Sequence, residues 1–276
     1  MSLIRLSFAG RKNNMNLFLI KKTLLYRLVS GHKYGHRIHS PFVFDLIRSV
    51  FRASSNVSAF KMIEKRRKQL LADSFEITIE DMGAGSKQNA SNVRTIQYVA
   101  RTSATSGKYA LLLYHLVEHY KPETIVEMGT SLGIGTAYLA TGNTNAKLIT
   151  LEGSHSIAEK ARETFQACNL SNVEVVEGNF NQTLSPVLES LKRVDFAFID
   201  GNHTKEATLR YFDQIVPYCT SKSILVFDDI SWSEGMNEAW NTIIADERVR
   251  ISIDVCKLGI VFFREGIVKQ NFVIRY

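Results

Sequence analysis

Hydrophobic positions follow two different periods along the chain, and the change comes near residue 120. Before it, the apolar spacing is helical over 17–30, 41–51, 59–71, about 90–101 and 109–120, while FEITIE at 75–80 alternates as a short strand does. After it, apolar runs typical of strands alternate with helical segments. The predicted strands are TIVEMG (124–129), KLITLEG (147–153), VEVVEG (173–178), DFAFIDG (195–201) and SILVFDDI (223–230), with two more near 249–256 and 259–264.

This order of elements predicts the fold. Strands that are apolar almost throughout are buried on both faces, which is typical of a parallel sheet covered by helices. We therefore expect an α/β protein with a doubly wound, mostly parallel, Rossmann-like sheet of seven strands and an N-terminal helical cap. The expected division is a basic helical arm and cap over residues 1–107 and a ligand-binding domain over residues 108–276. A ligand should lie at the carboxyl ends of the strands.

The composition is that of an ordinary globular protein of 276 residues, 45% hydrophobic, with four prolines. Cys168, Cys219 and Cys256 are far apart and form no metal-binding spacing, so we expect free thiols in a reducing compartment. The apolar run at 17–20 is too short for a signal-peptide core or a membrane span. A cytoplasmic location is the expectation.

The basic residues are concentrated in the N-terminal arm. Residues 1–44 contain eight Lys or Arg and no acid, whereas the whole chain carries +7. Within the arm, Leu17, Ile20, Leu24 and Leu28 form one helical stripe. We favour burial of this stripe against protein, as a lid or a homodimer contact. A weak contact with a membrane surface stays open, while no nucleic-acid partner is expected because an aromatic-interleaved basic stripe is absent.

A glycine loop follows the first predicted parallel strand, in VEMGTSLGIGTAYL at 126–139. Glycine allows a sharp turn or a close approach of the backbone to a ligand, so the loop is a candidate nucleotide site. Its pattern is Gly129-x-Ser131-x-Gly133-x-Gly135, which is neither GxGxxG nor a P-loop. The loop contains no Lys or Arg to balance a diphosphate.

The ends of the next two strands supply groups suited to a nucleoside. Glu152 follows Gly129 by 23 residues, where a carboxylate can accept hydrogen bonds from both ribose hydroxyls, and Asn179 and Phe180 can meet an adenine edge and face. A nucleoside without phosphate is therefore the expected ligand. S-adenosylmethionine fits this description better than NAD or ATP.

The chain from about residue 108 resembles class I S-adenosylmethionine-dependent methyltransferases, and among them the catechol and caffeoyl-CoA O-methyltransferase-like group. The resemblance rests on EMGTSLG (127–133), LEGS (151–154), DFAFIDGNH (195–203) and FDDISW (227–232). It implies that the methionine portion of the cofactor is lined by Glu127, Gly129, Thr130, Ser131, Gly133 and Asp200. It also implies that Glu152 holds the ribose and that Asn179 and Phe180 hold the adenine.

Three carboxylates follow the fourth and fifth parallel strands. Asp200, Asp228 and Asp229 would repel one another without a countercharge, and a hard cation such as Mg²⁺ would remove the repulsion. The resemblance implies such a metal, although the usual pattern has Asn at the position of Asp229. On this basis, changing Asp228 and Asp229 to Ala should leave the stability of the metal-free protein unchanged or slightly higher.

His203 is the candidate base, with Asp200 beside it. The resembled enzymes often have a lysine at that position, and a histidine can take a hydroxyl proton near neutral pH. The alternative is a structural His203 hydrogen-bonded to Asp200 or to the backbone. Trp232 corresponds to an aromatic residue that walls the substrate pocket, with core packing as its alternative.

A second glycine motif, EDMGAGS at 80–86, imitates a cofactor loop but is followed by polar residues and no acid-terminated strand. We expect a cap beside the site, with Asp81 as a candidate substrate contact. The predicted function is transfer of a methyl group to an oxygen of a small molecule, assisted by a divalent metal. Two alternatives stay open: a metal-independent methyltransferase acting on nucleic acid or protein, and a non-catalytic binding protein with the same fold.

Overall fold

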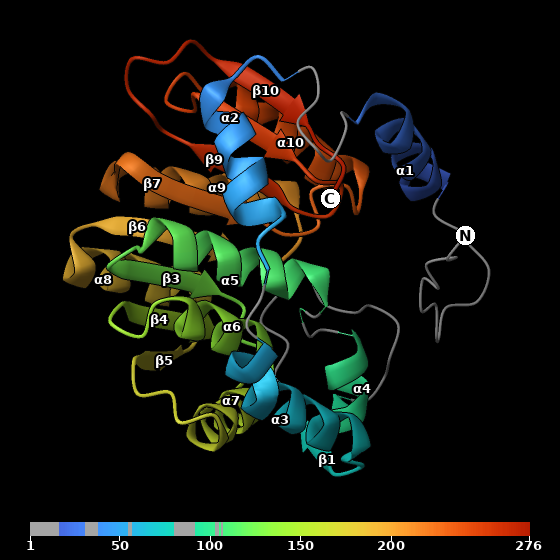
Figure 1. The fold of residues 1–276 in the computed structure, drawn as a ribbon. Coiled ribbons are helices and arrows are strands. Elements are labelled where there is room, and N and C mark those ends of the chain that lie inside the picture. The colour runs from blue at the N-terminus through green and yellow to red at the C-terminus, as the bar shows by residue number, and fades with distance from the viewer. Residues whose placement is uncertain (1–16, 31–37, 55–56, 80–91, 103–104, 106) are drawn as a thin grey trace.

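The computed structural model describes residues 17–30, 38–54, 57–79, 92–102, 105 and 107–276 (Figure 1). Its α-helices are α1 (Leu17–Val29), α2 (Pro41–Leu46), α3 (Lys61–Ala72), α4 (Ile96–Thr102), α5 (Lys108–Tyr120), α6 (Ile134–Gly142), α7 (His155–Ala167), α8 (Phe180–Leu191), α9 (Lys205–Ile215) and α10 (Glu234–Ala245). A π-helix η1 (Ile47–Phe51) continues α2, and two 3-10 helices are η2 (Val57–Phe60) and η3 (Val216–Tyr218).

The centre of the molecule is a twisted sheet with strand order β10-β8-β9-β7-β6-β3-β4-β5. Its strands are β3 (Thr124–Met128), β4 (Lys147–Glu152), β5 (Val173–Glu177), β6 (Val194–Ile199), β7 (Cys219–Phe227), β8 (Ile251–Asp254), β9 (Gly259–Phe262) and β10 (Gln270–Val273). From β5 to β7 all pairs are parallel, whereas β9 is antiparallel to both β7 and β8. The predicted α/β, doubly wound, Rossmann-like class is confirmed.

The prediction of seven strands in this sheet is wrong, because β10 adds an eighth at the edge within the described residues. It pairs parallel to β8, with Gln270 opposite Ile251. The strand has four residues, and its central Asn271 is exposed, so its sequence lacks the apolar run that marks the inner strands. Tertiary pairing rather than local pattern defines this strand.

Helices bury both faces of the sheet. On one face α2, η1, α5 and α6 share a core with β3, β6 and β9, where Leu46, Leu113 and Phe198 are at most 1% exposed. On the other face α8, α9 and α10 pack through residues such as Tyr211 and Trp240. The helix starts agree with local chemistry: the hydroxyl of Thr204 accepts from the backbone N–H of Ala207 at the start of α9.

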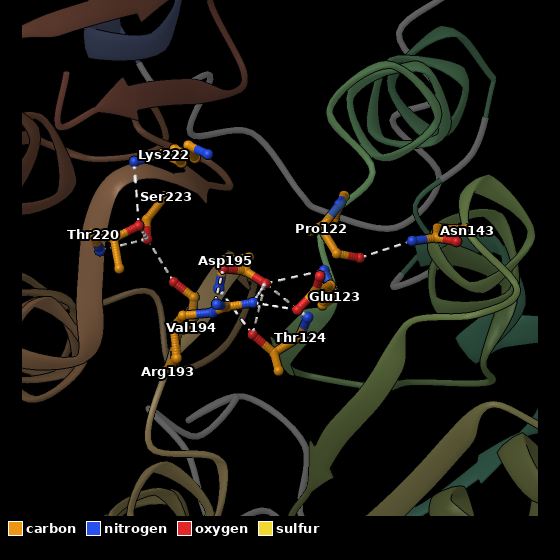
Figure 2. Close-up of polar contacts among 10 residues, drawn as sticks. All are labelled: Pro122, Glu123, Thr124, Asn143, Arg193, Val194, Asp195, Thr220, Lys222 and Ser223. Carbon is orange, nitrogen blue, oxygen red and sulfur yellow. Dashed lines mark hydrogen bonds and ion pairs between the residues drawn. The ribbon is translucent and has the colours of Figure 1, made fainter.

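The amino ends of β3, β6 and β7 are joined by a polar network, which Figure 2 shows. One carboxylate oxygen of Asp195 accepts hydrogen bonds from the backbone N–H groups of Glu123 and Thr124, at 2.9 and 3.1 Å. The Ser223 hydroxyl donates to the carbonyl of Val194 at 2.6 Å. These bonds fix the strands at the edge away from their carboxyl ends, where the candidate site lies.

The segment before α5 differs from the prediction in one place. A small antiparallel ribbon joins β1 (Glu76–Thr78), within the predicted 75–80 strand, to β2 (Val93–Thr95). A helix was expected from about residue 90, but it begins only at Ile96, after β2. Pairing of Thr95 with Glu76 keeps this part of the chain extended. The ribbon, α3 and α4 share a third core with Leu132 and Ile134, which border the glycine loop.

Helix α1 lies beside the C-terminal strand (Figure 1). The Tyr26 hydroxyl donates to the carbonyl of Ile274 at 2.7 Å. Within this chain the leucine stripe is not covered: Leu24 is 55% and Leu28 83% exposed, because the helix docks through its opposite side. The alternative of a homodimer contact stays a prediction. Across the described residues, no helix combines the length and apolarity needed to cross a membrane.

Candidate functional site

The glycine loop leaves the carboxyl end of β3 and touches the end of β6. Gly129 has φ +101°, and a Cβ atom there would lie 2.3 Å from the backbone carbonyl oxygen of Asp200. Gly133, with φ +79°, begins α6, and its Cβ would lie 2.7 Å from the ring of Phe165. Both positions therefore need glycine for conformation and for space.

A small pocket opens between this loop and the end of β6. Its lining comes from the loop backbone, from Glu127 and Asp200, and from Thr105 of the segment before α5. Thr105 is buried, and its hydroxyl donates to Asp200 Oδ2 at 3.3 Å. Sequence reasoning missed Thr105, because a threonine in a polar segment carries no motif.

Glu127 is a buried acid at the base of the pocket, 1% exposed. Its Oε2 accepts hydrogen bonds from the hydroxyls of Thr136 and Thr150, at 2.5 and 2.6 Å. Burial raises the pKa of Glu127 to about 7, against the opposing effect of these two hydrogen bonds. A ligand with a positive charge would favour the ionised carboxylate.

Glu152 ends β4, and both of its carboxylate oxygens already bind backbone. Ser131 N–H donates to Oε2 at 3.0 Å, and Ser154 N–H donates to Oε1 at 3.1 Å. Ser131 has φ +49°, so this contact holds a strained turn of the glycine loop. Burial raises the pKa of Glu152, although its backbone hydrogen bonds act in the opposite direction. Each carboxylate oxygen keeps acceptor capacity for a ligand hydroxyl.

Asn179 and Phe180 lie at the start of α8. The side chain of Asn179 caps the helix by accepting from the N–H of Asn181 at 2.9 Å. The Phe180 ring packs against Gly201, where a Cβ atom would lie 2.4 Å from the ring. The structure thus gives both residues a packing role next to the end of β6. Their contact with an adenine stays a prediction.

The three predicted acids do converge at the carboxyl ends of β6 and β7. Burial and then the charge of Asp228 raise the pKa of Asp200 well above its usual range. Burial and Asp228 likewise raise the pKa of Asp229. Asp228 Oδ1 has no donor within the described chain.

A lysine that sequence reasoning missed lies among these acids. Lys257 Nζ is 2.9 Å from Asp228 Oδ2 and 3.9 Å from Asp229 Oδ1. It belongs to the turn between β8 and β9, and β9 runs antiparallel beside β7, so the turn lies at the carboxyl end of β7. The acids raise the pKa of Lys257 even though burial, the largest single influence, lowers it.

The premise of the metal prediction, that the three acids have no countercharge, is therefore wrong. The ammonium of Lys257 holds one of the two carboxylate oxygens of Asp228, Oδ2. A divalent ion would have to displace that ammonium or accept a cation about 3 Å from one of its ligands. These contacts do not fit the predicted Mg²⁺, and no step of the chemistry below depends on it.

His203 and Trp232 border the acid cluster. His203 Nε2 lies 3.6 Å from Asp200 Oδ1, beyond a hydrogen bond, and a third of its side chain is exposed. Trp232 is 42% exposed, and its backbone N–H donates to the carbonyl of Asp229 at 2.9 Å. Core packing is thus wrong for Trp232, whereas Trp240 is a core residue. Asp81 lies outside the described residues.

Residues 126–230 match the family model of a methyltransferase domain. This range contains the glycine loop, Glu127, Glu152 and the three acids. The chain carries a methyltransferase domain. The prediction of an enzyme of this class, made from the same motifs, is confirmed at the level of the family. The match ends before Trp232, which the sequence already indicated, and before Lys257, which only the structure brings to attention.

Solved structures share the fold of the methyltransferase domain. An O-methyltransferase from Bacillus cereus in complex with SAH has a TM-score of 0.53 and 19% identity over 80% of this chain and 97% of its own. An SAH-bound methyltransferase from Podospora anserina has a TM-score of 0.57 and 14% identity, over 93% of this chain and 100% of its own. The O-methyltransferase TomG from Streptomyces achromogenes, in complex with SAM, has a TM-score of 0.56 and 15% identity, over 80% and 96%.

An uncharacterized protein, R132, of Acanthamoeba polyphaga mimivirus is 25% identical over 155 residues, which cover 51% of this chain and 70% of the viral protein. The caffeoyl-CoA likeness seen in the motifs also has a structural counterpart. A putative caffeoyl-CoA O-methyltransferase from Staphylococcus aureus has a TM-score of 0.53 and 16% identity, over 60% of this chain and 88% of its own. At these identities the structural likeness establishes the fold.

Proposed function

We propose that this protein transfers a methyl group from S-adenosylmethionine to an oxygen of a small molecule. The observation that carries the proposal is the buried carboxylate of Glu127 at the base of a pocket made by the glycine loop. A carboxylate held in such a place is costly unless it receives a positive charge. The ammonium group of the methionine portion is a suitable partner.

S-adenosylmethionine, when bound, supplies a methyl group made electrophilic by a sulfonium. Glu127 would hold the amino acid end of the cofactor, and Glu152 would accept hydrogen bonds from the ribose hydroxyls. Asp200 lies at the border between the pocket and the acid cluster, where its side chain would face the sulfonium. The SAM-bound and SAH-bound relatives with this fold support the choice of cofactor.

On the acceptor side, the proposed base is His203. A partly exposed imidazole beside Asp200 can take the proton of an acceptor hydroxyl near neutral pH. The oxygen forms the new bond to carbon as the carbon–sulfur bond breaks, and S-adenosylhomocysteine leaves. Trp232, exposed at the rim, would give the acceptor an aromatic wall.

The charge of the cluster favours a small acceptor over nucleic acid. Asp200, Asp228 and Asp229 outnumber the cation of Lys257 at the place where an acceptor would bind, and phosphates would be repelled there. Transfer to oxygen is supported by the relatives named as O-methyltransferases. The proposed location is cytoplasmic, on the basis of the isolated cysteines.

Incubation with S-adenosylmethionine labelled on the methyl group tests the proposal. The acceptors are a panel of phenols and aliphatic alcohols, with RNA and a denatured protein as separate reactions. We expect label in a hydroxyl compound and a rate about 10²-fold or more lower in His203→Ala. Transfer to RNA or protein alone, or a protein that binds no cofactor, would contradict the proposal.

A further inference from the structure

Lys257 is held rigidly at the end of its β-hairpin. Its carbonyl accepts from the N–H of Ile230, at 3.1 Å, which ties the hairpin turn to the loop after β7. Its own N–H donates to the carbonyl of Val255, at 3.1 Å, and Cys256 N–H donates to Asp254 Oδ1, at 2.7 Å. Three hydrogen bonds, two between backbone groups and one to the Asp254 side chain, therefore fix the point from which the lysine side chain extends.

The ammonium of Lys257 supplies positive charge to Asp228 and Asp229, which a metal would otherwise have to supply. In the described part of the chain, the ion pairs of Asp228 and Asp229 are both with Lys257. Asp228 is 3% exposed, so an unpaired charge there would be costly. The Lys257 side chain is 37% exposed, so it is not sealed from solvent. Its three N–H donors exceed the single hydrogen bond made to Asp228.

We propose that Lys257 takes the place of a divalent cation, and that the site binds and orients its acceptor without a metal. The ammonium pairs with Asp228 and Asp229 and donates a hydrogen bond to the acceptor oxygen, stabilising the negative charge that develops as His203 removes the proton. This inference deepens the proposed function and rests on it for the acceptor, whereas the exclusion of metal stands on the geometry alone.

Mn²⁺ titration followed by electron paramagnetic resonance tests the exclusion, in the absence of cofactor and acceptor. The proteins are the full chain, Lys257→Ala, Lys257→Gln, Lys257→Arg, Asp228→Asn and the double variant Lys257→Ala/Asp228→Asn. We expect the wild type and Lys257→Arg to bind no Mn²⁺ at the cluster. Lys257→Ala and Lys257→Gln should gain one site, with affinity about tenfold or more above wild type, which the Asp228→Asn change removes.

Lys222→Ala is the matched control, because Lys222 is an exposed lysine near the amino ends of the strands, away from the acids at their carboxyl ends (Figure 2). It should bind Mn²⁺ as the wild type does. One equivalent bound by the wild type and lost in Asp228→Asn would overturn the proposal, even if every Lys257 variant failed to fold. Folded Lys257→Ala and Lys257→Gln proteins without a new site would also overturn it.

Activity separates this inference from the proposed function. If a methyl acceptor is found, wild-type turnover should survive EDTA, and Lys257→Gln should raise KM for the acceptor while leaving cofactor affinity unchanged. Turnover that EDTA abolishes and Mg²⁺ restores would overturn the metal exclusion. Absence of any methyl transfer would count against the proposed function alone, since Mn²⁺ binding is measured without it.

Discussion

Gly129 lies directly against the backbone carbonyl of Asp200. The distance from that oxygen to a Cβ atom built on Gly129 is 2.3 Å, far inside van der Waals contact, and the φ angle of +101° is one that other residues rarely adopt. This contact brings the glycine loop of β3 onto the end of β6. Through this contact the glycine loop, which forms one wall of the cofactor pocket, is packed directly against Asp200, which is one acid of the cluster.

Gly129→Ala should therefore disrupt the pocket. The added methyl group must push the loop from the end of β6, and we expect a loss of stability of roughly 1–3 kcal/mol together with a loss of S-adenosylhomocysteine binding. Gly266→Ala is the matched control, because Gly266 has φ +72° but nothing within 4 Å of its Cβ. Thermal unfolding and calorimetry check both proteins. Equal effects of the two changes would mean that φ alone matters.

Glu127→Gln should change how stability depends on pH. The folded pKa of Glu127, about 7, lies above its ordinary 4.5, so its contribution is fully present below pH 4.5 and is lost as pH rises to 7. Glu127→Gln has no carboxyl group to ionise, so its free energy of unfolding does not fall in this way. Relative to the wild type, the free energy of unfolding of the variant should therefore increase between pH 4.5 and pH 7, by at most about 3 kcal/mol. Urea unfolding at pH 5 and pH 8 measures both proteins. The same difference in unfolding free energy at the two pH values would contradict the raised pKa of Glu127.

Asp228→Ala/Asp229→Ala should lower the melting temperature in EDTA. The sequence alone predicted unchanged or higher stability, through relief of repulsion, but the structure gives both acids a lysine partner. The substitution leaves the partly exposed ammonium of Lys257 without these partners. Adding Lys257→Met should recover part of the loss. A melting temperature unaffected by the double change would show that the ion pairs contribute nothing.

The exposed leucines of α1 should bind an anionic membrane surface. Leu24 and Leu28 are uncovered, and Lys21 and Arg27 on the same helix are exposed and complement anionic lipid. Leu24→Ser/Leu28→Ser should reduce co-sedimentation with phosphatidylserine vesicles, and binding should fall between about 50 and about 200 mM salt. Val268→Ser, which changes a 77% exposed valine elsewhere, is the control. A wild type that ignores vesicles but is dimeric would assign the leucines to a dimer.

The fold was predictable from sequence because its information is local. Each inner strand is a short apolar run, and each motif acid lies at the end of such a run or directly after it, so β3, Glu127 and the glycine loop could be placed from neighbouring residues. The convergence of Asp200 with Asp228 also followed, because the carboxyl ends of adjacent parallel strands meet at one edge.

Lys257 could not be predicted in the same way. It belongs to a turn that local reasoning treats as a connection, and it reaches the acids because β9 inserts antiparallel beside β7. Thr105 joins the pocket through a similar long-range contact, 95 residues from Asp200 in sequence. The stripe of α1 was assigned to a buried face since periodicity shows that a helix is amphipathic but not which side docks.

Calorimetric titration with S-adenosylhomocysteine tests the central claim, that the pocket beside Glu127 and Glu152 binds this cofactor, most directly. We expect one site in the wild type and affinity weaker by roughly 1–3 kcal/mol in Glu152→Ala, which loses a charged acceptor for the ribose. Glu265→Ala, in an exposed loop, should bind as the wild type does. No binding by the wild type, or equal affinity in Glu152→Ala, would contradict the account.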